Sequence, residues 1–166
     1  MLDLETLGTS PGSVIVAIGA VKFGEGKIIS EFYERVNAES CAKLGLKIDA
    51  ATVMWWMGQN DEARKEITKP GGELADVLSD FYSWVFGPDV VEMWGNGANF
   101  DNVLLSDAFA AAKIPRPWKY SNDRCYRTVK NLHPEVQMDR NGTHHNALDD
   151  ARSQAMHLME ILGKEF

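Results

Sequence analysis

The pattern at the start of the chain restricts the fold most. Residues 13–23 (SVIVAIGAVKF) form a continuous apolar and β-branched run, which is typical of a buried strand. A turn at residues 24–26 (GEG) follows, and residues 27–36 (KIISEFYERV) then alternate apolar and polar side chains, as in a strand with one solvated face. Together with a short strand expected at residues 1–6, this pattern predicts a three-stranded antiparallel meander.

A helical period replaces the alternation in the rest of the chain. Short strands are expected at 90–94 (VVEMW) and 118–121, with a turn at 95–97 and a polar loop at 134–143. A hairpin followed by strands that alternate with helices predicts an α/β fold, in which a mixed central sheet carries helices on both faces. No linker or repeat divides the chain, so residues 1–166 are expected to form a single domain. The expected helices cover residues 49–57, 61–67, 74–86, 100–112, 124–132 and 146–162.

Composition excludes several classes of protein. The 17 basic and 24 acidic residues give a net charge of −7, which disfavours nucleic-acid binding through a broad basic surface but not through bound cations. No apolar run approaches the ~18 residues of a membrane span, and the N-terminus does not resemble a signal peptide, so a cytoplasmic protein without a membrane partner is expected. Cys41 and Cys125 are accordingly expected to be reduced thiols.

Two acids lie close together near the N-terminus. Asp3 and Glu5 are two residues apart on an expected strand, so both carboxylates point to one face, while Leu2 and Leu4 point to the other. A solvated strand end would give the same pattern. Alternatively, a divalent cation between the two anions would make their proximity favourable. Only Met1 and Leu2 precede Asp3, so either the strand has little lead-in or the true start of the protein lies upstream.

Two further acids lie at the starts of expected helices. Asp101 follows the strand VVEMW, either as a helix cap or as a ligand at the end of a strand, where α/β sheets place their sites. At ~100° per residue, Asp150 lies beside the small apolar stripe of the last helix and is expected to face the sheet, whereas Asp149 is expected to face water. His145 precedes this helix on a loop, and the adjacent His144 is an alternative to it as the active histidine. The stripe consists of Ala147, Ala151, Ala155, Leu158 and Leu162.

The order D-x-E, mid-chain Asp and H-x-A-x-x-D resembles the DEDDh branch of the DnaQ-like 3′–5′ exonucleases, which have an RNase H-like fold. Longer segments resemble the phage-type group that is similar to exodeoxyribonuclease VIII, and a related group is described as 3′–5′ exoribonucleases. These segments are DLETLGTSPGSVIVAIGAV, WWMGQNDEAR, WGNGANFDN, PWKYSNDRCYRT and HHNALDDARSQA. The resemblance implies two Mg²⁺ ions, replaceable by Mn²⁺, with His145 as the general base. The implied metal ligands are Asp3, Glu5, Asp101 and Asp150.

The implied reaction is hydrolysis of a single-stranded nucleic acid from its 3′ end to nucleoside 5′-monophosphates, with DNA favoured over RNA. An alternative of a different class is a catalytically silent nucleic-acid-binding module on the same fold. The edge strand of the hairpin could pair two copies as a homodimer, but no residue pattern fixes an oligomeric state.

The expected substrate contacts are less specific than the acids. The resemblance puts the residues after the first two acids against the terminal nucleotide. Trp55 and Trp56 would stack on bases or, for at least one of them, belong to the core. Polar residues at the expected turns would contact phosphate or sugar, or would only cap turns. The full set is Thr6, Leu7, Gly8, Trp55, Trp56, Asn96, Asn99 and Arg124.

Overall fold

The computed structural model describes residues 1–87, 91–140, 142 and 145–163, and in these residues it has one five-stranded mixed sheet. The predicted meander is confirmed, because β1, β2 and β3 pair antiparallel, while β4 pairs parallel with β1 and with β5. The order across the sheet is β3-β2-β1-β4-β5. The strands are β1 (Leu2–Thr6), β2 (Ile15–Gly24), β3 (Lys27–Arg35), β4 (Met93–Gly95) and β5 (Asp123–Cys125).

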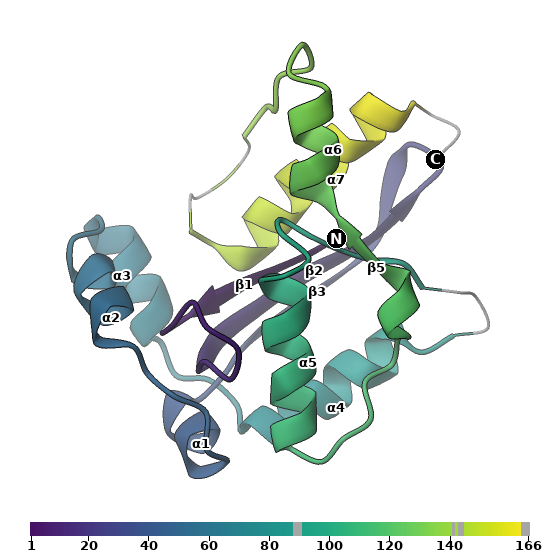
Figure 1. The fold of residues 1–166 in the computed structure, drawn as a ribbon. Coiled ribbons are helices and arrows are strands. Elements are labelled where there is room, and N and C mark those ends of the chain that lie inside the picture. Colours follow the sequence, from purple (N-terminus) through teal and green to yellow (C-terminus); the bar gives the residue numbers. More distant parts are fainter. Residues whose placement is uncertain (88–90, 141, 143–144, 164–166) are drawn as a thin grey trace.

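Helices cover both faces of the sheet, as predicted, and the α/β fold is consistent with an RNase H-like architecture. Figure 1 shows α6 and α7 on one face, α4 and α5 on the other, and α2 and α3 beyond the end of β1. None of the described helices is long and apolar enough to cross a membrane. The helices are α1 (Ala38–Lys43), α2 (Ala50–Met57), α3 (Asp61–Thr68), α4 (Leu74–Val85), α5 (Asp101–Ala111), the 3₁₀ turn η1 (Tyr120–Asn122), α6 (Tyr126–Leu132) and α7 (Ala147–Leu162).

Two apolar cores form because alternate side chains of a strand point to opposite faces. Leu2 and Leu4 of β1 belong to the core that packs under α4 and α5, together with Phe81 and Leu105. Val21 of β2 belongs to the other core, which packs under α6 and α7. The charged residues between Leu2 and Thr6 are therefore directed to the face that α7 covers.

Helix α7 approaches the sheet closely at Gly19. In the strand register, Gly19 of β2 pairs with Asp3 on one side and with Tyr33 on the other. A Cβ atom at Gly19 would overlap with the backbone of Ala147 and Leu148, in the first turn of α7. The small residue, together with the fully buried alanine stripe of α7, lets the start of this helix lie directly beside Asp3.

The prediction of a strand at residues 118–121 is wrong, because the strand in this part of the chain covers residues 123–125. Trp118 is buried, and its indole nitrogen donates to Asp123 Oδ1 at 2.9 Å. Asp123 in turn pairs with Met93, so the ladder with β4 uses residues 123–125. Two residues of the helix expected at 124–132 therefore belong to β5, and α6 begins at Tyr126.

Other element bounds differ by smaller amounts. Gly95 belongs to β4 rather than to a turn, because it pairs with Leu2. Residue 90 of the strand expected there lies outside the described residues, as do parts of the loop expected at 134–143. No element was expected just after residue 36, but the Asn37 side chain caps α1 by accepting from the Glu39 N–H at 3.0 Å. Both cysteines are free thiols, as expected.

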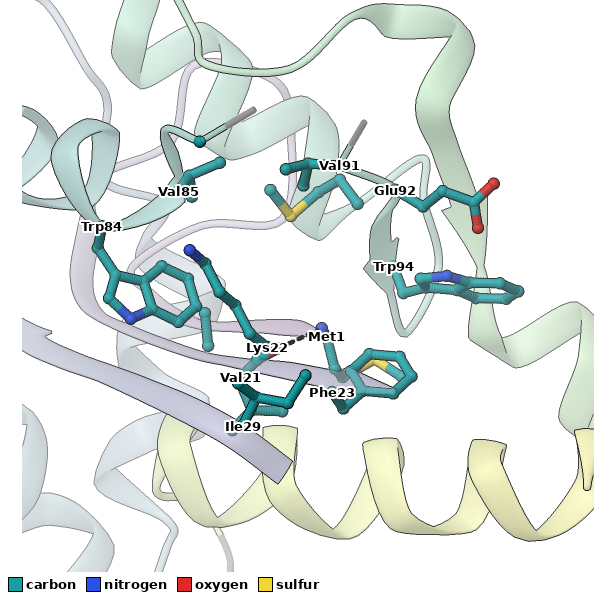
Figure 2. A pocket seen from close by; sticks show the side chains of 13 residues that line it. Met1, Val21, Lys22, Phe23, Ile29, Trp84, Val85, Val91, Glu92 and Trp94 are labelled. Atoms are coloured by element: carbon teal, nitrogen blue, oxygen red, sulfur yellow. Dashed lines mark hydrogen bonds between the residues drawn. The ribbon is translucent and has the colours of Figure 1, made fainter. Parts of the chain in front are cut away.

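A cavity of about 350 Å³ lies at the end of the sheet where β1 begins. Figure 2 shows Trp84, Lys22 and Glu92 among the side chains that line it, and the Met1 amino group donates to the Val21 carbonyl at 2.8 Å. Lys22 Nζ lies 5.1 Å from the centroid of the Trp84 ring. This cavity is at the opposite end of β1 from Glu5 and Thr6.

The contact at Gly19 gives a stability prediction. We expect Gly19→Ala to lower the free energy of unfolding by about 1–3 kcal/mol, because the new methyl group must displace helix backbone. Gly24→Ala on the same strand is the control, since the nearest atom to its Cβ is Ile29 Cδ1 at 4.0 Å, and its effect should stay within about 0.5 kcal/mol. Urea unfolding of both variants measures the difference, and equal stabilities would contradict the proposed close approach.

Candidate metal and nucleic-acid site

The two acids of β1 lie under the first turns of α7. Asp3 Oδ1 accepts a hydrogen bond of 2.8 Å from Gln154 Nε2 of α7. Glu5 lies opposite Ala17 of β2 in the register and is 6% exposed. Small residues on β2 therefore face both acids, which leaves room for the helix above them.

Asp101 is the first residue of α5 and is 3% exposed. Its carboxylate accepts backbone hydrogen bonds from Leu4 and Asn96, so it bridges β1 and the loop after β4. The next residue, Asn102, donates from Nδ2 to the Met93 carbonyl and to Asp123 Oδ1, both at 2.8 Å. These bonds fix the start of α5 against two strands and thereby aim Asp101 at β1.

The start of α7 supplies the remaining acid and the histidine. The Asn146 side chain caps the helix by accepting from the N–H groups of Leu148 and Asp149. The His145 backbone N–H donates to Asp150 Oδ2 at 3.2 Å. Glu5, His145 and Asp150 each offer one ligand atom, and these atoms lie within 4.8 Å of one another. The structure thus brings together residues that are about 140 positions apart in the sequence.

The acids are close enough for the charge of one to raise the pKa of another. Burial raises the pKa of Glu5 to about 8, and the charges of Asp150, Asp101 and Glu66 add to the shift. Burial also raises the pKa of Asp101 to about 7, although its backbone hydrogen bonds oppose the rise. The pKa of Asp3 lies well above its ordinary value because of burial and then because of Asp101, Glu5 and Asp150.

This donor set fits a hard divalent cation. Carboxylate oxygens are the ligands that Mg²⁺ and Mn²⁺ prefer, and zinc sites usually draw on more nitrogen or sulfur. The pKa values of Asp3 and Glu5 are raised first by burial and then by repulsion from the neighbouring carboxylates, so their ionisation without a partner is unfavourable. A bound cation would remove that repulsion.

A pocket of about 450 Å³ opens beside Glu5. Thr6 and Trp55 are in its lining, and Trp55 is 48% exposed. Trp56 also reaches the lining, but it is 3% exposed and donates from Nε1 to the Thr6 carbonyl at 2.8 Å. The burial of Trp56 favours the alternative expected for at least one of the two tryptophans, in which the ring belongs to the core. Trp55 keeps the exposed ring that stacking requires.

The residues after Glu5 shape the turn that follows β1. Thr6 is buried, and its hydroxyl donates to the Gly8 carbonyl at 2.7 Å. A side chain at Gly8 would overlap with Ser13, so glycine lets these two loop segments meet. Leu7 packs against the apolar core under α4 and α5. Of the three, Thr6 lines the pocket.

The polar residues predicted to contact substrate divide between two places. Asn96 lies at the site, since its N–H binds Asp101, and Asn99 is exposed on the same loop. Arg124 instead donates from Nη2 to Glu92 Oε1 at 2.7 Å, ahead of β4, whereas the acids lie beyond the end of that strand. Its expected substrate contact is therefore not supported by the structure. Arg127, which no sequence pattern indicated, donates from Nη2 to the Asn96 carbonyl at 2.6 Å.

The start of α7 differs from expectation in one respect. Asp149 was expected to face water, but its side chain is 22% exposed and pairs with Arg152 Nη1 at 2.8 Å. Asp150 is 16% exposed, and its Oδ1 accepts from Arg140 Nη1 at 3.1 Å. The alternative histidine, His144, lies outside the described residues. Gln154 was also missed, although its position one helical turn after Asp150 places it on the same face.

The family follows from comparison of the whole chain with known proteins. A model of the 3′-5′ exoribonuclease Rv2179c-like domain matches residues 1–162. The chain belongs to this family. An exodeoxyribonuclease of Enterobacteria phage T4 is 24% identical over 121 residues, which are 64% of this chain. The chain spans about half of that relative, since the match covers 53% of the phage protein. The acidic cluster is thus part of a 3′–5′ exonuclease domain.

The pKa of Glu66, another acid near this exonuclease site, is lowered, whereas the pKa of Glu5 is raised. Burial raises the pKa of Glu66, but hydrogen bonds from Lys69, Tyr33 and Arg35 lower it by a larger amount, to about 2. The stability that Glu66 contributes is therefore present above its unfolded pKa and lost only in strong acid. Between pH 5.5 and 8.5, Glu66 stays ionised in both states, so any slope of stability with pH reports other groups.

We expect the metal-free protein to lose stability as the pH rises from 5.5 to 8.5. The folded state holds the Glu5 proton up to a pKa of about 8, above the ordinary 4.5, so the stabilisation present at low pH is lost through this window. One carboxyl contributes a slope of about 1.4 kcal/mol per pH unit. Thermal unfolding in chelator measures the slope, which Glu5→Gln should reduce and the exposed control Glu25→Gln should not. A slope that is unchanged in Glu5→Gln would contradict the burial of this charge.

Proposed function

We propose that this chain is a metal-dependent 3′–5′ exonuclease that removes nucleoside 5′-monophosphates from the 3′ end of single-stranded nucleic acid. The observation that carries the proposal is the convergence of Glu5, His145 and Asp150 within 4.8 Å, from β1 and from the start of α7. Membership in a 3′-5′ exoribonuclease domain family and the similarity to a phage exodeoxyribonuclease support the same reaction.

The proposed metal ligands are Asp3, Glu5, Asp101 and Asp150, which would hold two Mg²⁺ ions or Mn²⁺ in their place. When bound, the ions supply the positive charge that lowers the pKa of an attacking water and stabilises the leaving 3′ oxygen. Gln154 holds Asp3 in place, and the backbone N–H groups of Leu4 and Asn96 hold Asp101. The bound ions would supply the positive charge that an acidic protein otherwise lacks at a phosphate-binding site, and the fixed carboxylates would hold the ions there.

His145 is the proposed general base. Its ring nitrogen is within 4.8 Å of carboxylate oxygens of Glu5 and Asp150, where a water bound to the cluster would lie. An imidazole accepts a proton near neutral pH, so it would take the proton of the attacking water as the phosphodiester bond breaks. The hydrogen bond from the His145 N–H to Asp150 ties the base to one of the proposed ligands.

We propose that the pocket beside Glu5 is the binding site of the terminal nucleoside. Its volume of about 450 Å³ is within the range of small-ligand sites, and Trp55 offers an exposed ring against which a base would stack. The family description names RNA and the phage relative's name refers to DNA. We propose DNA as the favoured substrate and RNA as the second one.

We expect Asp150→Asn to abolish shortening of a 5′-labelled oligonucleotide in Mg²⁺, with a loss of at least about 100-fold, because one of the charges that hold the ions is removed. The matched control is Asp149→Asn, which removes the neighbouring acid that pairs with Arg152. Gel time courses with and without chelator measure both variants. Asp150→Asn with wild-type rates would remove this residue from the proposed ligand set.

The same assay shows which nucleic acid is the better substrate. It also distinguishes an exonuclease from a catalytically silent binding module. Matched single-stranded DNA, single-stranded RNA and a duplex with a 3′ overhang give relative rates for the three substrates. Faster shortening of DNA is the expected result. A protein that binds the oligonucleotide in Mg²⁺ but never shortens it would instead be a silent binding module.

A further inference from the structure

We propose that Trp55 is a positioning residue for His145, and that it couples filling of the adjacent pocket to the placement of the imidazole. The inference rests on the proposed exonuclease function, because it assumes that His145 acts on the substrate. It is carried by an aromatic cluster that joins α2 to the start of α7.

The His145 ring lies against the rings of two tryptophans. Its centroid is 5.1 Å from that of Trp55 at an interplanar angle of 88°, and 5.6 Å from that of Trp56 at 75°. The two indoles lie 4.9 Å apart at 72°. All three contacts are edge-to-face, the arrangement in which the positive edge of one ring meets the negative face of the next.

The cluster is anchored to the acidic site at one end. Trp56 is buried, and its Nε1 donates to the carbonyl of Thr6, which follows Glu5 directly. Trp55 contacts Trp56, and both contact His145. The distance between His145 and Glu5 is therefore set in part by α2, an element that carries none of the proposed ligands.

The backbone of His145 needs such support. Its φ of 63° is in the left-handed region, which a residue with a Cβ adopts at a cost and keeps only where its surroundings hold it. The residue also precedes the helix cap Asn146 rather than lying within α7. Ring contacts from α2 are one of the restraints that hold the imidazole over the cluster.

Trp55 also borders the pocket, and unlike Trp56 it exposes its ring to solvent. It lines the pocket beside Glu5 and is 48% exposed, so a nucleoside in the pocket would pack against the same indole that contacts His145. Filling the pocket would restrict Trp55 and, through it, His145. Trp55 would thus affect both binding of the nucleotide and placement of the base.

A double-mutant cycle tests this assignment. We expect Trp55→Leu to lower kcat about tenfold and to raise KM, whereas Trp55→Phe keeps a ring and restores most of kcat. In a His145→Ala background, measured as single turnovers with enzyme in excess, Trp55→Leu should still raise the half-saturating enzyme concentration but should change the maximal rate constant less than about twofold. An equal loss of kcat in both backgrounds would overturn the inference, because Trp55 would then act without His145.

A spectroscopic measurement keeps the test independent of turnover. The chain has 4 histidines, and His145→Ala assigns the imidazole signal of His145 in a carbon–proton NMR spectrum. Ring currents from Trp55 should displace this signal, and Trp55→Leu should return it toward the free-imidazole position. A signal that does not move overturns the inference.

Met54→Leu is the control on the same helix, since Met54 is 65% exposed and outside the pocket lining. It should leave both kcat and the histidine signal unchanged, and a change as large as that of Trp55→Leu would attribute the effect to α2 as a whole and overturn the inference. A wild-type protein that shortens no oligonucleotide would contradict the proposed function alone, because the NMR measurement still reports whether Trp55 holds His145.

Discussion

The close approach of α7 to the sheet at Gly19 is the constraint on which the rest of the site depends. The side chains of a strand normally keep a helix backbone away from the sheet, but here the helix backbone occupies the space that a Cβ of residue 19 would take. The alanines of α7 remove the same bulk from the other surface. Only because both surfaces are small do Asp150 and His145 reach the acids of β1.

The electrostatics follow from this packing. Buried carboxylates that the fold brings close together have raised pKa values because each charge loses solvation and is repelled by the others. The protein tolerates the cost through the fixed hydrogen bonds from Gln154 to Asp3 and from the backbone to Asp101. Such preorganised repulsion is typical of a site that is completed by a cation rather than of a stabilising network.

The positions of the acids follow from local periodicity. The period-two rule placed Asp3 and Glu5 on one face, and the helical period placed Asp150 beside the alanine stripe. The ion pair of Arg124 with Glu92 could not be predicted, because the position of Arg124 in the chain says nothing of its partner in the fold. Trp55 and Trp56 are adjacent in sequence, and only the register of α2 decided which ring is buried.

The sequence alone determined the antiparallel meander, the mixed sheet with helices on both faces and the spacing of the acids, because hydrophobic period and residue spacing are local properties. Tertiary structure decided what lies beside what: Gly19 under Ala147, Trp118 on Asp123, and the two indoles on His145. These contacts join segments far apart in the chain. They arise from the packing of whole elements, so no local pattern in the sequence contains them.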